Sequence, residues 1–383
     1  MKNRKGLAWL FALFAVLSLL ATACGSSDSS SSDKTTTTKA AADGGDTTTT
    51  AAPDTAGLDK LSGKLDGQGS SLQDTFEQQV SSDFTKAVSS AGGSAAVTYT
   101  KTGSGDGKKA LADKTVGFAG TDSPIKDDEA PNFGSRKMLY FPLIGSPITV
   151  AFNVKGVDAL KLSPETVAGI FAGTIKTWDD KAIAADNDGV DLPSTAITVV
   201  HRSDASGTTS NFTKYLAAAA PDVWKLTPGD TVEWPSGSSF QGAEKSTGVT
   251  SVVQSTDGAV TYADLADAAK AKLDVADIGD GNGKFVAPTP DGASAALAAA
   301  KVADDLTFNP LNTKADGAYP ITSPTYILVD AVQKDAATAA VVKAYLNYVL
   351  TTGQAQAKPL LYAALPDALA QKAVDQLDQI TAG

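Results

Sequence analysis

The sequence predicts an α/β protein with two lobes. Short apolar runs alternate with segments of helical periodicity, and this alternation is typical of sheets covered by helices on both faces. The part that can fold is about 325 residues long, which is more than one hydrophobic core usually accommodates. The predicted strands are residues 96–100, 116–119, 138–143, 148–153, 197–200, 260–262 and 326–329.

The chain opens with a predicted signal peptide, residues 1–23. Three basic side chains lie within the first five residues, and an apolar run at residues 7–20 leads to small residues before Cys24. This order is typical of a secretion signal, and the apolar run is too short to be read first as a membrane span. Cys24 is the only cysteine of 383 residues, so no disulfide can form within one chain.

A tether is predicted after the signal. Residues 25–57 consist almost wholly of Ser, Thr, Asp, Ala, Gly and Lys, without Val, Ile, Leu or aromatic side chains. Such a segment cannot bury enough apolar surface to offset its ordering entropy. The segment ending at Cys24 resembles a bacterial lipoprotein signal, in which the cysteine becomes the lipidated first residue. We therefore predict that residues 24–65 form a lipid-anchored, disordered linker.

Capping residues mark the predicted helices. Ser163 is a typical N-cap, Pro164 suits the first helical position, and Glu165 places an acid in the first turn of a helix over residues 165–171. Gly353 is a typical C-terminal residue for a helix that begins near residue 335. Further predicted helices cover residues 73–88 and 210–220 and a segment that begins near residue 366.

One loop has the composition of an anion-binding site. Residues 202–209 read Arg-Ser-Asp-Ala-Ser-Gly-Thr-Thr and lie between a predicted strand and a predicted helix. The free N–H groups and the positive dipole end of that helix favour an anion. Gly207 lets the backbone approach closely, while Ser206 and Thr208 add hydroxyl donors. The alternative interpretation is an ordinary capped helix after a turn.

Arg202 strengthens the anion interpretation. Its planar guanidinium presents a fork of donors suited to a tetrahedral oxyanion. Asp204, two residues on, is expected to pair with Arg202 and to hold that fork in place.

Three other loops have a similar composition. They are residues 67–71, residues 103–107, and residues 117–124, in which Asp122 follows a buried strand. Each glycine-rich loop alone is more often a flexible turn, and an Asp before Ser-Pro is more often a turn or cap residue. The 103–107 loop also lacks the spacing of a phosphate-binding P-loop.

These four segments, in this order, resemble the phosphate-binding proteins of bacterial high-affinity phosphate ABC transporters. Residues 173–180, Gly-Thr-Ile-Lys-Thr-Trp-Asp-Asp, and residues 320–328 also match, so the resemblance spans roughly residues 66–366. It implies a two-lobed, type II periplasmic-binding-protein-like fold with the ligand cleft between the lobes. Lobe I would comprise residues 66–144 and 323–383, and lobe II residues 145–322. No cofactor or metal is implied.

The resemblance also implies a set of phosphate contacts. Lobe I would contribute the backbone N–H groups of Ser71 and Leu72, the hydroxyl and N–H of Ser104, and the carboxylate of Asp122. Lobe II would contribute Arg202, Ser206, Gly207 and Thr208, with Asp204 restraining Arg202. An ionised Asp122 would accept the proton that phosphate carries at neutral pH, whereas sulfate offers it none.

Composition limits the other function classes. A net charge of −11 without a basic block disfavours nucleic acid as a partner. Evidence for an enzyme is thin, because His201 is the only histidine and neither a G-x-S-x-G motif nor a metal-ligand cluster is present. We therefore expect a monomeric, lipid-anchored protein on the extracytoplasmic face of the membrane that delivers phosphate to ABC permease subunits. The alternatives are a phosphate-ester hydrolase and another tetrahedral-oxyanion binding or sensing protein on the same scaffold.

Overall fold

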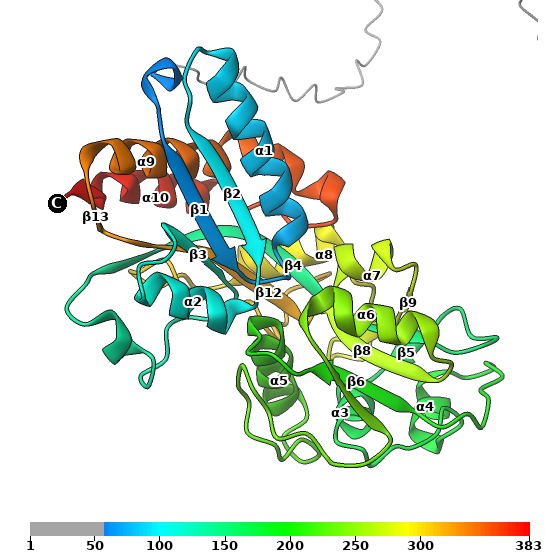
Figure 1. The fold of residues 1–383 in the computed structure, drawn as a ribbon. Coiled ribbons are helices and arrows are strands. Elements are labelled where there is room, and N and C mark those ends of the chain that lie inside the picture. The colour runs from blue at the N-terminus through cyan, green and yellow to red at the C-terminus, as the bar shows by residue number, and fades with distance from the viewer. Residues whose placement is uncertain (1–56) are drawn as a thin grey trace, which may run out of the picture. The chain divides into compact units, whose positions relative to one another are not determined.

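The computed structural model describes residues 57–383, and its fold is α/β, as predicted (Figure 1). The predicted signal peptide, Cys24 and the predicted linker as far as residue 56 lie outside the described residues. The strands are β1 (Lys64–Gly69), β2 (Ala96–Lys101), β3 (Phe118–Thr121), β4 (Met138–Asn153), β5 (Lys161–Leu162), β6 (Thr198–Arg202), β7 (Phe240–Ala243), β8 (Ala259–Asp264), β9 (Asp274–Val275), β10 (Asp277–Gly279), β11 (Phe285–Val286), β12 (Thr322–Asp330), β13 (Val332–Gln333) and β14 (Thr381–Ala382).

The structure contains all five helices that the sequence predicts, which are α1, α3, α5, α9 and α10. The α-helices of the described residues are α1 (Asp74–Ser90), α2 (Ser104–Ala112), α3 (Pro164–Phe171), α4 (Lys181–Asp186), α5 (Gly207–Ala219), α6 (Lys245–Ser255), α7 (Leu265–Lys270), α8 (Pro290–Ala299), α9 (Ala336–Leu350) and α10 (Asp367–Gln376). Ser163 caps α3 as predicted, because its side chain accepts from the N–H of Thr166. None of the helices in residues 57–383 is both long and apolar enough to span a bilayer.

One sheet carries most of the strands. Its order is β2-β1-β3-β12-β4-β8-β6-β7, and β9 also pairs with β4. β1 is parallel to β2 and β3, and β6 is parallel to β7 and β8. The long strand β4 pairs antiparallel with β12 over residues 138–147 and with β8 over residues 148–153. It therefore links the two halves of the sheet.

The prediction of two separate strands at residues 138–143 and 148–153 is wrong. They form the single sixteen-residue strand β4. Pro142 and Pro147 suggest an interruption, since proline removes a ladder donor. The strand continues because its pairing changes from β12 to β8 here, and the register against β12 shifts between Pro324 and Tyr326.

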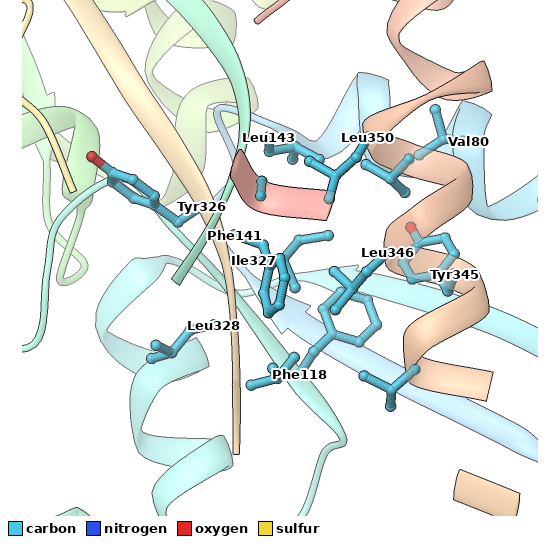
Figure 2. Close-up of a cluster of buried hydrophobic side chains, with 14 of the residues drawn as sticks. Val80, Phe118, Phe141, Leu143, Tyr326, Ile327, Leu328, Tyr345, Leu346 and Leu350 are labelled. Carbon is cyan, nitrogen blue, oxygen red and sulfur yellow. The ribbon is translucent and has the colours of Figure 1, made fainter. Parts of the chain in front are cut away.

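Two large clusters of buried apolar side chains cover this sheet. The first core lies around β1–β3, β12, α1 and α9, and Figure 2 shows part of it, with Phe118 of β3 facing Tyr345 of α9. The ring centroids of these two residues are 5.7 Å apart. The second core lies around β6, β8, α3 and α5 and includes Trp178 and Trp224. In Figure 1 the elements of the second core are mainly green.

The membership of the first core differs from the predicted domain boundaries at two places. Residues 58–65, assigned to the linker from the sequence, are part of the fold, because Leu58 and Leu61 are buried in the first core. Ala293 and Leu297 of α8 also belong to the first core, although the sequence assigned them to lobe II. The lobe boundaries therefore stay a prediction.

A buried carboxyl in the first core gives a pH-dependent stability. Glu77 of α1 is fully buried, and the hydroxyl of Tyr345 donates to its Oε2 at 2.5 Å. Burial raises the pKa of Glu77 to about 8, against the lowering by the Tyr345 hydrogen bond. The folded protein therefore keeps a proton that the unfolded chain releases above pH 4.5. This contribution to stability is complete below pH 4.5 and is lost as the pH rises towards 8.

Glu77→Gln should remove this pH dependence. Between pH 5 and pH 8.5 the variant should lose less unfolding free energy than wild type, by on the order of 3 kcal/mol. Chemical denaturation at both pH values measures the difference. Glu165→Gln, at an exposed position in the first turn of α3, is the control and should keep the wild-type slope. An unchanged slope in Glu77→Gln would contradict the prediction.

Candidate anion-binding site

The loops predicted to bind an anion meet in one place. β1 and β3 are adjacent parallel strands, so their carboxyl ends bring Ser70 and Asp122 together. α5 begins at Gly207 beside them, close to Ser104 at the start of α2. All eight predicted contact residues are buried. The site is therefore shielded from water, which strengthens every electrostatic interaction within it.

Asp122 has one engaged and one free carboxylate oxygen. Its Oδ2 accepts hydrogen bonds from Ser70 Oγ at 2.7 Å and from Ser104 Oγ at 3.2 Å. Its Oδ1 is buried and has no hydrogen-bond partner among the described residues. Burial raises the pKa of Asp122 to about 7, although the Ser70 and Ser104 hydrogen bonds and the charge of Arg202 lower it. The buried Oδ1 needs a hydrogen-bonding partner.

Gly207 lets α5 approach this carboxylate. A Cβ at position 207 would lie 2.6 Å from Ser104 Oγ and 2.7 Å from the Cβ of Asp122, so no larger residue fits without a shift. The N–H groups of Gly207 and Thr208 lie in the first turn of α5 and have no acceptor within the helix. Thr208 Oγ1 is also buried without a partner in the described part of the chain. The first turn of α5 thus presents donors beside the buried carboxylate of Asp122.

The predicted pair of Arg202 and Asp204 is present. Arg202 Nε donates to Asp204 Oδ1 at 2.6 Å, and a terminal guanidinium nitrogen bonds Oδ2. The N–H of Lys245 also donates to Asp204 Oδ1, at 3.0 Å. Burial alone would raise the pKa of Asp204, but Arg202 outweighs it and the pKa is lowered. Arg202 is 4 % exposed, so the guanidinium is held in a nearly dry environment.

The prediction of a loop at residues 103–107 is wrong. The structure places Ser104 at the start of α2, so only Gly103 remains outside the helix. Gly103 has a φ of 108°, and a Cβ there would lie 2.8 Å from Asp204 Oδ2. This close approach explains glycine at position 103. Asp106 lies on the exposed side of α2, so it brings no second carboxylate into the site.

The side chain of Ser71 and the N–H of Leu72 have hydrogen-bond partners within the protein. Ser71 Oγ lies 3.0 Å from Ser246 Oγ and accepts from the Ser246 N–H at 3.1 Å. The N–H of Leu72 donates to Ser70 Oγ at 3.1 Å, and the Leu72 side chain is buried in the second core. A ligand that used this N–H would share it with Ser70.

Two residues of the site were missed. Ser70 holds Oδ2 of Asp122, and only its position beside Ser71 in the same loop indicated it. Asn211 Nδ2 donates to the main-chain oxygens of Asp122 at 2.6 Å and Gly207 at 3.1 Å. Asn211 lies four residues after Gly207 on α5, and this helical spacing was the available signal. Ser70 therefore holds the Asp122 carboxylate, and Asn211 ties the backbone of Asp122 to α5.

His201 packs against an aromatic ring next to the site. The His201 ring stacks on Trp234 with centroids 5.0 Å apart, and its Nδ1 lies 3.1 Å from the main-chain oxygen of Arg202. Burial lowers the pKa of His201 from its ordinary value. Within residues 57–383, no group of three or more His, Cys, Asp or Glu side chains could hold a metal ion.

Comparison with known proteins identifies the class to which the fold and the site belong. A family described as a PBP superfamily domain matches residues 27–352. A solved structure of a high-affinity periplasmic phosphate-binding protein (PfluDING) bound with phosphate superimposes with a TM-score of 0.67 at 25 % identity, covering 82 % of this chain and 93 % of that chain. A phosphate-binding protein from Stenotrophomonas maltophilia shares the fold, with a TM-score of 0.64 at 22 % identity over 82 % of this chain and 94 % of that one.

Curated relatives narrow the class to one family. The phosphate-binding protein PstS of Xylella fastidiosa (strain Temecula1) is 32 % identical over 81 % of this chain and 83 % of its own length. PstS of Methanocaldococcus jannaschii is 37 % identical over 67 % of this chain and 72 % of its own. PstS 2 of Mycobacterium tuberculosis is 35 % identical over the same two shares. This chain belongs to the family of PstS phosphate-binding proteins.

Proposed function

We propose that the protein binds one inorganic phosphate ion between α5 and the ends of β1 and β3, and delivers it to an ABC permease for import. The observation that carries the proposal is the free Oδ1 of Asp122, on a buried carboxylate that lies beside Gly207 in the first turn of α5 and interacts with the charge of Arg202. A carboxylate next to groups that donate hydrogen bonds to an anion suits an anion that carries its own proton. Phosphate does so at neutral pH.

The donors and the acceptor have distinct roles. The hydroxyls of Ser206 and Thr208, the N–H groups of Gly207 and Thr208, and Arg202 would donate to phosphate oxygens. Ser104 would contribute its N–H, and its hydroxyl would bind phosphate only by turning its one hydrogen away from Asp122 Oδ2. Ser206 Oγ already accepts from the N–H of Thr209 at 3.2 Å, so its hydrogen is free to donate. Asp122 Oδ1 would accept the phosphate hydroxyl. Against sulfate, an ionised Asp122 would face a lone pair in a dry site, which leaves both groups unpaired.

The Ser71 and Leu72 N–H groups complete the proposed set. The fold places their loop directly after β1, where Ser70 contacts Asp122. Leu72 would bind phosphate only while sharing its N–H with Ser70 Oγ. We expect these two contacts to be the weaker part of the site.

Calorimetric titration with phosphate tests the proposal, with a parallel assay for ester hydrolysis. We expect one phosphate bound per chain and no turnover of a phosphate ester. Ester hydrolysis that is lost in Arg202→Ala would favour the alternative enzyme. Stoichiometric binding of sulfate as tightly as phosphate would favour a general oxyanion receptor.

A lipid anchor at Cys24 belongs to the proposal. It rests on the lipoprotein-like signal and the Ser/Thr-rich tether, both in residues outside the described part of the chain. Cys24→Ala should leave the protein released to the medium or still carrying its signal peptide. The purified variant should bind phosphate like wild type, since the folded part is unchanged. Membrane fractionation with mass spectrometry of the N-terminus measures the effect, and unchanged membrane retention with the signal removed would contradict the anchor.

A further inference from the structure

A buried group of charged side chains lies next to the proposed phosphate site. Lys108 of α2 is 2 % exposed, and its Nζ lies 2.7 Å from Glu129 Oε2 and 3.2 Å from Asp230 Oδ2. Asp230 is also 2 % exposed and accepts from Lys126 Nζ at 3.2 Å. The two lysines and two carboxylates balance one another, and Lys214 adds a further positive charge that interacts with Asp230.

The Lys108–Asp230 pair joins the two cores. Lys108 is on α2, whose Leu111 is buried in the first core. Asp230 lies in the segment between α5 and β7, where Trp224 is buried in the second core and Trp234 packs against it. The pair therefore forms only while the segments carried by the two cores are in contact.

Asp230 also contacts the neighbours of the proposed ligand contacts. Ser123, the residue after Asp122, donates from Oγ to Asp230 Oδ1 at 3.3 Å. The N–H of Ser206 donates to the main-chain oxygen of Asp230 at 2.9 Å. Asp230 is thus linked to the β3 side and to the α5 side of the site.

We propose that Lys108 and Asp230 are positioning residues that set phosphate affinity by holding the cleft closed. The inference rests on the proposed phosphate function, and neither residue belongs to the proposed phosphate contacts. In an open cleft both charges are hydrated. Closure buries them 3.2 Å apart, so loss of one partner leaves the other charge buried with less compensation.

The state of Asp230 agrees with a charged pair. Burial alone would raise its pKa, but the charges and hydrogen bonds of Lys108 and Lys126 outweigh burial and lower it. Lys126 is about two-fifths exposed, at 39 % of its side chain, so it compensates Asp230 less fully than the buried Lys108 does.

Lys108→Met should weaken phosphate binding by about tenfold or more, because it leaves the buried Asp230 without one of its two lysine partners. Lys126 retains part of the attraction and limits the loss. The loss should appear mainly as faster phosphate dissociation, since the pair forms after the ligand has entered. Lys109→Met is the matched control on the same helix, because Lys109 is exposed and its one ion pair within residues 57–383 is with the exposed Asp113 at 2.6 Å. Stopped-flow tryptophan fluorescence and calorimetry measure the rates and the Kd.

The double variant Lys108→Met/Asp230→Asn separates positioning from general stability. It removes both charges, so it should bind phosphate more tightly than expected from the product of the two single effects. A Kd of Lys108→Met within twofold of that of Lys109→Met would overturn the proposal, and so would independent effects of the two single changes. If Arg202→Ala loses binding in that same series, the proposed phosphate function stands without the closing role of Lys108 and Asp230. Absence of phosphate binding by wild type and Lys109→Met would overturn both.

Discussion

Arg202→Ala should lose most of its phosphate affinity. The change deletes a charge-assisted fork from a nearly dry site and leaves Asp204 without its partner, 2.6 Å from where Nε had been. We expect a loss of about 3 to 5 kcal/mol, which corresponds to roughly 150-fold to 5,000-fold in Kd. Arg202→Lys should fall between wild type and the alanine variant, since a lysine keeps the charge but not the planar fork.

The doubled variant Arg202→Ala/Asp204→Ala tests the cause of that loss. Removal of Asp204 takes away an unpaired carboxylate beside the anion, so the double variant should bind phosphate better than Arg202→Ala alone. Calorimetry measures the Kd, and circular dichroism with thermal unfolding shows whether each variant is folded. Wild-type affinity in a folded Arg202→Ala protein would mean that the α5 loop does not bind the ligand.

Asp122→Asn should collapse the preference for phosphate over sulfate. The amide can donate an N–H to a fully ionised anion, and the repulsion from the carboxylate disappears. Phosphate affinity should fall modestly while sulfate affinity rises, in a site whose rejection of an ion without a hydroxyl can reach about 10⁴-fold. Asp106→Asn is the control, because Asp106 is an exposed carboxylate on the first turn of α2. A ratio within a factor of about two of wild type, under 0.5 kcal/mol, would rule out the proton-acceptor role.

The raised pKa of Asp122 adds a pH readout to the same experiment. With a pKa of about 7, the carboxyl is ionised above pH 7 and protonated below it. A protonated Asp122 can donate to sulfate, so sulfate affinity of wild type should rise as the pH falls through about 7. Asp122→Asn cannot titrate and should lose this trend. Competition between the two anions, followed by tryptophan fluorescence at pH 5.5 and 8.5, compares the two proteins.

Local sequence patterns predicted α1, α3, α5, α9 and α10, but they missed α2 and β1. Ser163 caps α3 where Ser-Pro-Glu indicated a helix start, because cap and first turn are short-range interactions. β1 was read as a loop because it contains Gly67 and Gly69. A Cβ on Gly67 would lie 2.1 Å from the Phe118 ring, so glycine is needed here because the neighbouring strand β3 packs closely. The local sequence does not reveal that neighbour.

In the candidate site too, features that are contiguous in the sequence could be predicted, and long-range contacts could not. The anion loop at residues 202–209 could be predicted because strand end, glycine and helix start are contiguous in the sequence. Only the family resemblance predicted Asp122 as a ligand contact, because its partners Ser70 and Ser104 are 52 and 18 residues away in the sequence. Lys108 and Asp230 are separated by 122 residues, and nothing in their local sequence indicates a buried pair. Contacts between segments so far apart in the chain required the structure.

A crystal structure of the protein with phosphate is the most direct measurement of the central proposal. Phosphate should lie between α5 and Asp122, with one oxygen roughly 2.5–2.7 Å from Asp122 Oδ1, the distance of a hydroxyl donating to a carboxylate. Its other oxygens should accept from Arg202 and from the Gly207 and Thr208 N–H groups. Phosphate bound elsewhere, or bound here with Asp122 Oδ1 still unpaired, would contradict the proposed recognition.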